Sequence, residues 1–540
     1  LESYKKWGFS SPAKLIGAFS FVIFDKKNDL IFAARDHMGM KPLYYSINRG
    51  KFIFSSNIST ILRNTNFLKK MNRERIIDFL LFFSPKEGET FYESIKKLPR
   101  SHYLIIKSEN IKLVKYFDFD IENKTIYKNA EEYSEHFYEL FSSIISDMNK
   151  RSYGNVGMTL SGGLDSSSIY SLSKKNNQGS VNIHSRSVIF KGLSKDDFKL
   201  VDEKNYMQDC INQYPNEYHR FIELDGTGPI SNLQKMTSLF DSPAMAINGY
   251  IYSYVFESLR SENVRVMMDG LDGDSVVSYG HELFPELAIR FKLLQLFKLA
   301  NQFNEVNKKG QPSKYKVLKK NLVFTMIPNR LYWIYRNMGP NKLIQYQMFN
   351  CLNEPVKDRI NLYERFKNHS INFSLKPSGN ARKDHKLSMS GVNWETAIES
   401  LEPLSSESKI EHRMPFFDRR LMEYCLSIPP EMKIKNGVNR YVFRKAMNGT
   451  LPESIRNRYT KSDLSPFAIR EINAMPQEEL DNLIFSNESP LHNLVDKLQV
   501  RLLFERLKLP TEDRSTLVFN LYRFISLSSW MKKEGFKWNN

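Results

Sequence analysis

The loop at 160–168, Leu-Ser-Gly-Gly-Leu-Asp-Ser-Ser-Ser, carries residue types that suit phosphate binding, and it directly follows a short strand-like run at 156–159. Its glycines let backbone N–H groups approach phosphate oxygens, and the helix that begins there adds its partial positive charge. Asp165 would repel phosphate unless a divalent metal ion lay between them. The alternative is an ordinary glycine turn in which Ser and Asp cap a helix.

A second loop, at 266–275, has the sequence Val-Met-Met-Asp-Gly-Leu-Asp-Gly-Asp-Ser. An apolar strand again ends in glycines and aspartates, as expected for a partner loop on a neighbouring strand. Asp165 and Asp274 together could bridge Mg²⁺ to phosphates, since the metal offsets the repulsion between the two carboxylates. Capping of the loop is the alternative role for Asp269 and Asp272.

Two later segments supply charged side chains. The stretch at 439–463 contains Arg440 and Lys461, cations that could stabilise charge developing on a phosphate, and a solvated basic face is the alternative. The stretch at 411–420, Glu-His-Arg-Met-Pro-Phe-Phe-Asp-Arg-Arg, begins with Glu411, which could act as a base or hold a substrate amine. Helix capping and salt bridges are the favoured roles for Arg413 and Asp418 in the same stretch.

These four segments resemble the ATP pyrophosphatases, and specifically the asparagine synthetase family. The loop at 161–167 is similar to the family's pyrophosphate loop, and the second loop is similar to its S-G-E-G-x-D-E motif. The later blocks resemble E-x-R-x-P-F-L-D and K-x-x-L-R…LP…R-x-K, with Arg440 in place of a lysine. The resemblance implies that ATP is cleaved between its α- and β-phosphates, that a carboxylate is adenylated, and that pyrophosphate is released.

The resemblance also implies roles for individual residues. Asp165 and Asp274 would bind Mg²⁺, and Lys461, Arg440 and Glu411 would be catalytic. The implied binding site for ATP and pyrophosphate is Leu160, Ser161, Gly162, Gly163, Asp165, Ser166, Ser187, Val188, Asp269 and Gly270.

The segment at 34–45, Ala-Arg-Asp-His-Met-Gly-Met-Lys-Pro-Leu-Tyr-Tyr, resembles class II glutamine amidotransferase domains. Those domains begin with a catalytic cysteine, whereas this chain begins with Leu1 and has neither signal peptide nor initiator methionine. We therefore expect a chain whose beginning is missing, with only part of that antiparallel, Ntn-type domain and no glutaminase. The Ala-Arg-Asp segment should pack against the synthetase domain.

The order of predicted elements favours an α/β fold. Strands at 18–24, 30–34, 43–47, 52–54, 102–106 and 111–117 predict an antiparallel sheet, with helices near 73–83 and 91–96. From 133 onward strands and helices alternate, which predicts a parallel sheet that binds its ligand at the carboxyl ends of the strands. After 282 the pattern is mostly helical. The expected domains are 1–120, a linker at 121–132, and a PP-loop synthetase domain at 133–540.

The amino-acid composition indicates which cellular compartment and which kinds of binding partner are favoured. The 540 residues include only three cysteines, which favours a reducing, cytoplasmic compartment without disulfides or a zinc site. No run approaches the roughly 18 uninterrupted apolar residues of a membrane span. The net charge of +18 comes from lysines scattered along the chain, so attraction of an anionic ligand such as ATP is favoured over nucleic-acid binding.

Two departures from the family pattern bear on the substrate. Leu271 stands where the family has a functional glutamate, and the stretch at 241–249 has no arginine to pair with the carboxylate of aspartate. A more apolar pocket favours a peptide or modified carboxylate, as in lasso-peptide macrolactam cyclases, with a precursor peptide and a leader protease as partners. An asparagine synthetase proper is the alternative. A tRNA-modifying enzyme and a non-catalytic scaffold are less favoured.

Overall fold

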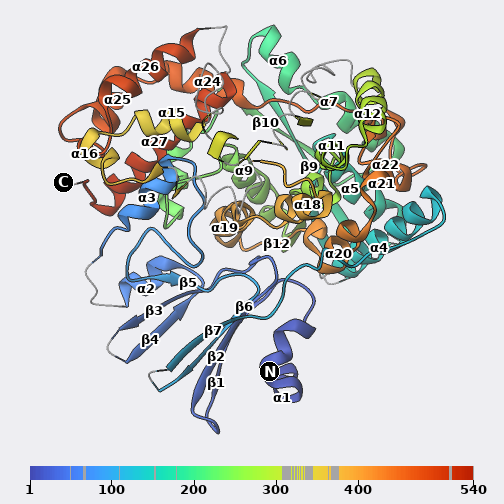
Figure 1. Cartoon of the computed structure of the whole chain (residues 1–540), viewed down its shortest axis with the longest axis horizontal. Coiled ribbons are helices and arrows are strands. Elements are labelled where there is room, and N and C mark those ends of the chain that lie inside the picture. Colours follow the sequence, from blue (N-terminus) through green and yellow to red (C-terminus); the bar gives the residue numbers. More distant parts are fainter. Residues whose placement is uncertain are drawn as a thin grey trace.

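The computed structural model describes the chain except residues 49, 65–68, 109, 151, 153, 178, 307–317, 319, 320, 323, 324, 326, 329, 333, 335–343, 363, 366–375, 510–513, 539 and 540. Figure 1 shows an N-terminal region built on antiparallel sheets and a larger region built around a parallel sheet. The predicted α/β class, with an antiparallel part at the N-terminus, is confirmed.

Two small antiparallel sheets form the N-terminal region, coloured blue in Figure 1, with the strand orders β1-β2-β6-β7 and β4-β3-β5. The first hairpin turns where Asp25 accepts hydrogen bonds from the backbone N–H groups of Lys27 and Asn28, both at 3.1 Å. The strands are β1 (Ser20–Asp25), β2 (Leu30–Arg35), β3 (Tyr44–Asn48), β4 (Lys51–Ser55), β5 (Lys96–Lys97), β6 (His102–Lys107) and β7 (Asn110–Lys115). The helices are α1 (Glu2–Trp7), η1 (Gly8–Lys14), α2 (Ile58–Arg63) and α3 (Arg73–Leu80).

The helix predicted near 91–96 is wrong, because this segment holds turns, an isolated bridge and the start of β5. The Thr90 hydroxyl lies 3.0 Å from the carbonyl oxygen of Tyr92 and 2.7 Å from that of Ile95, and it also accepts from the Tyr92 N–H. Such local side-chain bonds compete with the hydrogen bonds of a helix.

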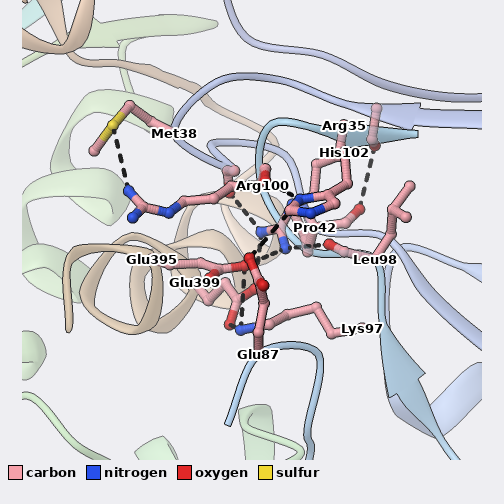
Figure 2. Close-up of polar contacts among 12 residues, drawn as sticks. Arg35, Met38, Pro42, Glu87, Lys97, Leu98, Arg100, His102, Glu395 and Glu399 are labelled. Atoms are coloured by element: carbon pink, nitrogen blue, oxygen red, sulfur yellow. Dashed lines mark hydrogen bonds and ion pairs between the residues drawn. The ribbon is translucent and has the colours of Figure 1, made fainter. Parts of the chain in front are cut away.

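The Ala-Arg-Asp segment packs against the larger region, as predicted. The Arg35 side chain is fully buried, and its two Nη atoms lie 2.6 Å from Glu395 and 2.8 Å from Glu399 on α19 (Val392–Glu407). Lys97 joins this cluster, with its Nζ 3.0 Å from Glu399. Figure 2 shows these side chains converging between the two regions. The ion pairs are thus a principal link between the regions.

A stretch without helix or strand, 116–129, covers most of the predicted linker and ends where α4 (Ala130–Lys150) begins. The larger region then forms a five-stranded sheet of order β10-β9-β8-β11-β12, in which all neighbours are parallel. Its strands are β8 (Asn155–Thr159), β9 (Asn182–Lys191), β10 (Arg220–Asp225), β11 (Val266–Met268) and β12 (Glu411–Arg413). The chain extends from β8 first to one side and then to the other, so the order reverses between β8 and β11. Ligands bind at such a reversal in open α/β sheets.

Helices cover both faces of this sheet. In β11, Val266 and Met268 belong to the core formed with α4 and α5 (Leu164–Asn176), whereas Met267 belongs to the opposite core, with α9 (Gly249–Arg260). The alternation follows from the two-residue period of a strand, and it explains why the run is apolar throughout. Further helices before β11 are α6 (Lys195–Val201), α7 (Lys204–Gln213) and α8 (Leu233–Leu239).

The part after β11 is mostly helical, as predicted, although the short strands β12, β13 (Ile434–Lys435) and β14 (Val438–Asn439) were missed. In Figure 1 the C-terminal α27 lies beside α3, so the chain's last long helix contacts the N-terminal region. The remaining elements are α10 (Gly273–Val277), α11 (Leu283–Ile289), α12 (Leu293–Val306), α15 (Ile344–Asn350), α16 (Glu354–Lys357), α18 (Ala381–Met389), η2 (Pro415–Phe417), α20 (Arg419–Ser427), α21 (Pro430–Lys433), α22 (Tyr441–Ala446), α23 (Glu453–Arg456), α24 (Ser465–Ala474), α25 (Gln477–Leu480), η3 (Asp481–Phe485), α26 (Lys497–Lys508) and α27 (Arg514–Glu534). Among the described residues, no helix combines the length and apolar character needed to span a membrane.

Candidate active site at the β8–β11 reversal

The two glycine-rich loops meet where the strand order reverses. A Cβ placed on Gly270 would lie 2.5 Å from the backbone nitrogen of Ser166, and one on Gly273 would lie 2.4 Å from Oδ1 of Asp165. Only glycine permits approaches this close without displacing the neighbouring loop. The glycines of the second loop thus serve to seat it against Asp165, an aspartate of the first loop.

The first loop is held open by its own serines. The Ser161 N–H donates to Oγ of Ser166 at 3.1 Å, and the two hydroxyls lie 2.9 Å apart. Gly162 has a φ of +73°, and a Cβ there would lie 2.8 Å from Cβ of Tyr206. Gly163 is the N-cap of α5, so the helix N-terminus opens directly onto the loop. This is the geometry of a phosphate-binding turn.

The second loop is positioned by Asp269. Its Oδ1 accepts from the Leu271 N–H at 2.8 Å, and its Oδ2 lies 2.7 Å from Nε2 of His412, on β12. Asp269 is itself buried, so its side chain acts on the loop rather than on a ligand. The capping role considered for Asp269 is what the geometry favours.

The two aspartates expected to bind metal are each paired with a cation. Arg440 donates to both carboxylate oxygens of Asp165, with Nη1 at 3.1 Å from Oδ2, and Lys461 pairs with Asp274. Tyr279 donates its hydroxyl to Asp274 at 3.0 Å. Burial opposes ionisation of Asp274, but Lys461 and Arg440 hold its pKa below the ordinary value. Four of the predicted residues therefore meet as two ion pairs across one site.

A third aspartate, Asp272, differs from these two. It is buried, adopts a left-handed φ of +58°, and neither of its carboxylate oxygens has a hydrogen-bond partner. Although it is the N-cap residue of α10, its side chain makes no cap hydrogen bond, so the capping role considered for it is wrong. Burial, together with the charges of Asp274 and Asp165, raises the pKa of Asp272 well above its ordinary value.

Asp272→Gly should therefore stabilise the fold, by about 1–2 kcal/mol, because it removes backbone strain and a buried carboxyl without partners. The unfolded carboxyl ionises from about pH 4 upward, whereas the raised pKa of the folded carboxyl delays its ionisation to higher pH, so the cost of Asp272 grows as pH rises above the unfolded value. The gain from the substitution should be larger at neutral pH than in acid. Urea unfolding at both pH values measures it, and a less stable glycine variant would contradict this reading.

A cavity of about 430 Å³ opens above these loops. The predicted binding residues that line it are Leu160, Ser161, Gly163, Asp165, Ser166, Val188 and Gly270, together with Asp274 and Lys461. An apolar wall completes it, formed by Phe190, Met207, Ile251, Tyr252, Val255, Leu271 and Leu464. The charged end of the cavity lies at the two loops. Its apolar wall suits a nucleobase and an apolar group of a second substrate.

Five of the predicted residues are not part of the cavity lining: Gly162, Asp269 and Arg440, whose contacts are given above, and Ser187 and Glu411. Ser187 is fully buried, and its hydroxyl donates to the Leu160 carbonyl at 2.6 Å, so it supports the first loop from below. Glu411 lies at the start of β12, paired in register with Val266, while the site lies at the opposite, carboxyl ends of the strands. Its carboxylate is 2.9 Å from Nε of Arg413. The expected catalytic role of Glu411 thus finds no support in the geometry, and the structure instead shows Glu411 in an ion pair with Arg413.

One positioning residue was not assigned from the sequence. Arg458 lies 2.7 Å from Glu203 and 3.2 Å from the carbonyl oxygen of Gly162, and its guanidinium covers the ring of Tyr206 at 4.3 Å. It therefore anchors the phosphate loop to α7. The sequence shows that Arg458 belongs to the block that resembles R-x-K, but nothing in the sequence indicates which loop it would hold.

The donor set fits a hard divalent cation. Within the part of the chain that the structure describes, no group of three or more Asp, Glu, His or Cys side chains is arranged to hold a metal alone. Mg²⁺ is typically held by one or two carboxylates plus substrate phosphates, and Asp165 and Asp274 supply that number. The fit thus depends on a phosphate-bearing substrate that completes the coordination.

Two protein families match the chain. Residues 145–532 match the family described as "Asparagine synthase", and residues 1–117 match the "Glutamine amidotransferase domain". The chain is 23% identical to "Asparagine synthetase [glutamine-hydrolyzing] 3" of Bacillus subtilis over 516 residues, 94% of this chain and 76% of the relative.

Two further relatives extend the comparison. The chain is 30% identical to "Putative asparagine synthetase [glutamine-hydrolyzing] 2" of Methanocaldococcus jannaschii over 282 residues, 51% of this chain and 52% of that protein. It is 22% identical to "Amidase chyE" of Penicillium rubens over 506 residues, 86% and 71% of the two chains. Because the family match spans most of the chain, the chain belongs to the asparagine synthase family, whose members are ATP-dependent ligases that form carbon–nitrogen bonds.

Proposed function

We propose that this chain activates a carboxylate as an acyl-adenylate, releases pyrophosphate, and joins the activated carbonyl to an amine. The observation that carries the proposal is the pairing of Arg440 with Asp165 and of Lys461 with Asp274 at the mouth of a phosphate-binding loop. Mg²⁺, when bound with ATP, would neutralise the phosphates between the two aspartates.

The cations explain how the site changes its charge pairing when ATP enters. In the structure, each of the two aspartates is paired with one cation. With Mg²⁺ and ATP bound, Asp165 and Asp274 would hold the metal, and Arg440 and Lys461 would be available to face the phosphate oxygens. Cations placed at the α,β-bridging oxygen stabilise the charge that grows there as pyrophosphate leaves.

For the substrate, we propose a carboxylate larger and more apolar than free aspartate. Leu271, Ile251 and Tyr252 line the cavity, and free aspartate would bring two carboxylates and an ammonium that need charged partners when buried. A peptide carboxylate, as in lasso-peptide cyclases, meets this requirement. None of the three relatives named above carries the name of such a cyclase, and two of them are named asparagine synthetases, which favours the alternative, an asparagine synthetase.

The two substrates are distinguished by a direct comparison. The purified chain is incubated with ATP, Mg²⁺ and ammonia, and either free L-aspartate or a peptide whose carboxylate lies beside apolar residues. We expect the peptide to drive AMP formation and aspartate to be turned over poorly. Efficient asparagine synthesis would overturn the substrate proposal and establish the alternative.

A further inference from the structure

A second cavity, of about 370 Å³, lies between the N-terminal region and the larger region. Its wall includes Tyr44 and Ser59 from the N-terminal region, and Asp241 and Glu399 from the larger one. It shares no lining residue with the nucleotide cavity. It is therefore a separate space, and the charges on its wall indicate what it could hold.

Most charged groups on this wall are already balanced within the protein. Lys97 and Glu399 belong to the ion cluster of Figure 2, and Glu402 lies 3.3 Å from Nζ of Lys41. Asp241 accepts hydrogen bonds from the N–H groups of Ile58 and Ser59, at 2.9 and 3.0 Å. None of these four groups needs a ligand.

Arg75, on α3, is a charged wall residue without such a partner. Its side chain is buried, with the guanidinium 4.5 Å from the centre of the Phe91 ring and Nη2 3.9 Å from Sδ of Met245. Nη1 has no hydrogen-bond partner. The charges of Asp78, Glu89 and Glu399 act on Arg75, but among the described residues no carboxylate forms an ion pair with it. A buried cation left without an anion is costly, which points to a negatively charged group that is supplied from outside.

Glu89 presents the opposite charge on the same wall. Its Oε2 is buried and has no hydrogen-bond partner. Glu89 interacts electrostatically with Arg75, but the two form no ion pair. The wall of the cavity thus carries one cation and one anion with unmet hydrogen-bonding capacity.

We propose that this cavity binds a free α-amino acid, with its carboxylate on Arg75 and its ammonium group on Glu89. A small zwitterion supplies both missing partners at once, whereas an anion alone would leave Glu89 unpaired and a cation alone would leave Arg75 unpaired. The volume leaves room for a side chain beside the two charged groups. The inference goes beyond the proposed function, because it concerns a site remote from the nucleotide loops.

The test is ligand-induced thermal stabilisation of the whole chain, screened with each standard L-amino acid and followed by calorimetry of the best binder. We expect at least one amino acid to bind. Two analogues of that amino acid, the amine that lacks the carboxylate and the N-acetyl derivative that lacks the ammonium charge, should each bind more weakly by a factor on the order of ten or more. Failure of every amino acid to bind, or equal binding of either analogue, would overturn the proposal.

Two variants test whether the two charged side chains bind the ligand, and a third variant is the control. Arg75→Met keeps an apolar side chain against Phe91, and Glu89→Gln is isosteric, and each should weaken binding on the order of tenfold or more. Ser400→Ala is the matched control, since Ser400 lines the same cavity but donates its hydroxyl to Ala397 at 2.7 Å, and it should bind normally. Unchanged binding by Glu89→Gln and Arg75→Met would show that the ligand sits elsewhere. Retained ATP binding by both variants shows that they are folded, independently of the proposed function.

Discussion

Asp165→Asn and Asp274→Asn should each lower ATP–pyrophosphate exchange by a factor on the order of 10²–10⁴, while the fold is retained. Each substitution removes one of the two carboxylates that the site offers to Mg²⁺, and the charge stabilisation supplied by a catalytic metal amounts to several kcal/mol. Each also leaves a cation without its anion, Arg440 in one case and Lys461 in the other. The unpaired cation would further weaken the placement of the phosphates.

The double variant tests whether the two aspartates act as a unit. If both aspartates act through one metal, the double variant should lose about as much exchange activity as a single variant, and far less than the product of the two single losses. Asp209→Asn is a matched control, because Asp209 pairs with the Ser454 hydroxyl outside the cavity, and its exchange rate should be normal. An Asp274 variant that exchanged at the native rate would refute the two-loop metal site.

Lys461→Met should reduce pyrophosphate release by a factor on the order of 10²–10³ with any acceptor, since removal of one preorganised electrostatic group typically costs that much. Its partner in the structure is Asp274, so the cation is already aimed at the mouth of the loops. The loss should appear in kcat rather than in the KM for the acceptor, because Lys461 would act on charge that grows during adenylation.

Lys445→Met is the matched control for this substitution. Lys445 also forms an ion pair, 2.7 Å from Glu131, but it lies on α22 outside the cavity. Its activity should match that of the native chain. Equal losses in the two lysine variants would mean that the effect of Lys461 is one of folding or net charge.

The sequence was sufficient to locate both glycine-rich loops, because an apolar strand followed by glycines and aspartates is a local pattern. The pairing of Asp165 and Asp274 at one site also follows from the sequence, since both lie just beyond strands of one parallel sheet. The packing of Arg35 against the larger region was predicted only in outline. Its partners Glu395 and Glu399 are more than three hundred residues away, and no local pattern identifies them.

Other site assignments could not be made from the sequence, because they depend on which end or which face of a strand or helix a residue occupies. Glu411 lies in a recognisable motif, but β12 was not predicted, so its place at the start of that strand could not be inferred. Ser187 was assigned to the nucleotide, although the two-residue period of β9 turns it into the core. The raised pKa of Asp272 results from its burial and from the charges of Asp274 and Asp165, which the sequence does not reveal.

The products of ATP cleavage test the central claim, carboxylate adenylation at the two loops, most directly. The chain is incubated with ATP labelled at the α-phosphate, Mg²⁺, an amine and an ¹⁸O-labelled carboxylate. The nucleotides are then separated, and their masses are measured by mass spectrometry. The account predicts AMP and pyrophosphate in equal amounts, with one ¹⁸O atom transferred from the carboxylate to AMP. Formation of ADP and phosphate, or AMP without the label, would contradict it.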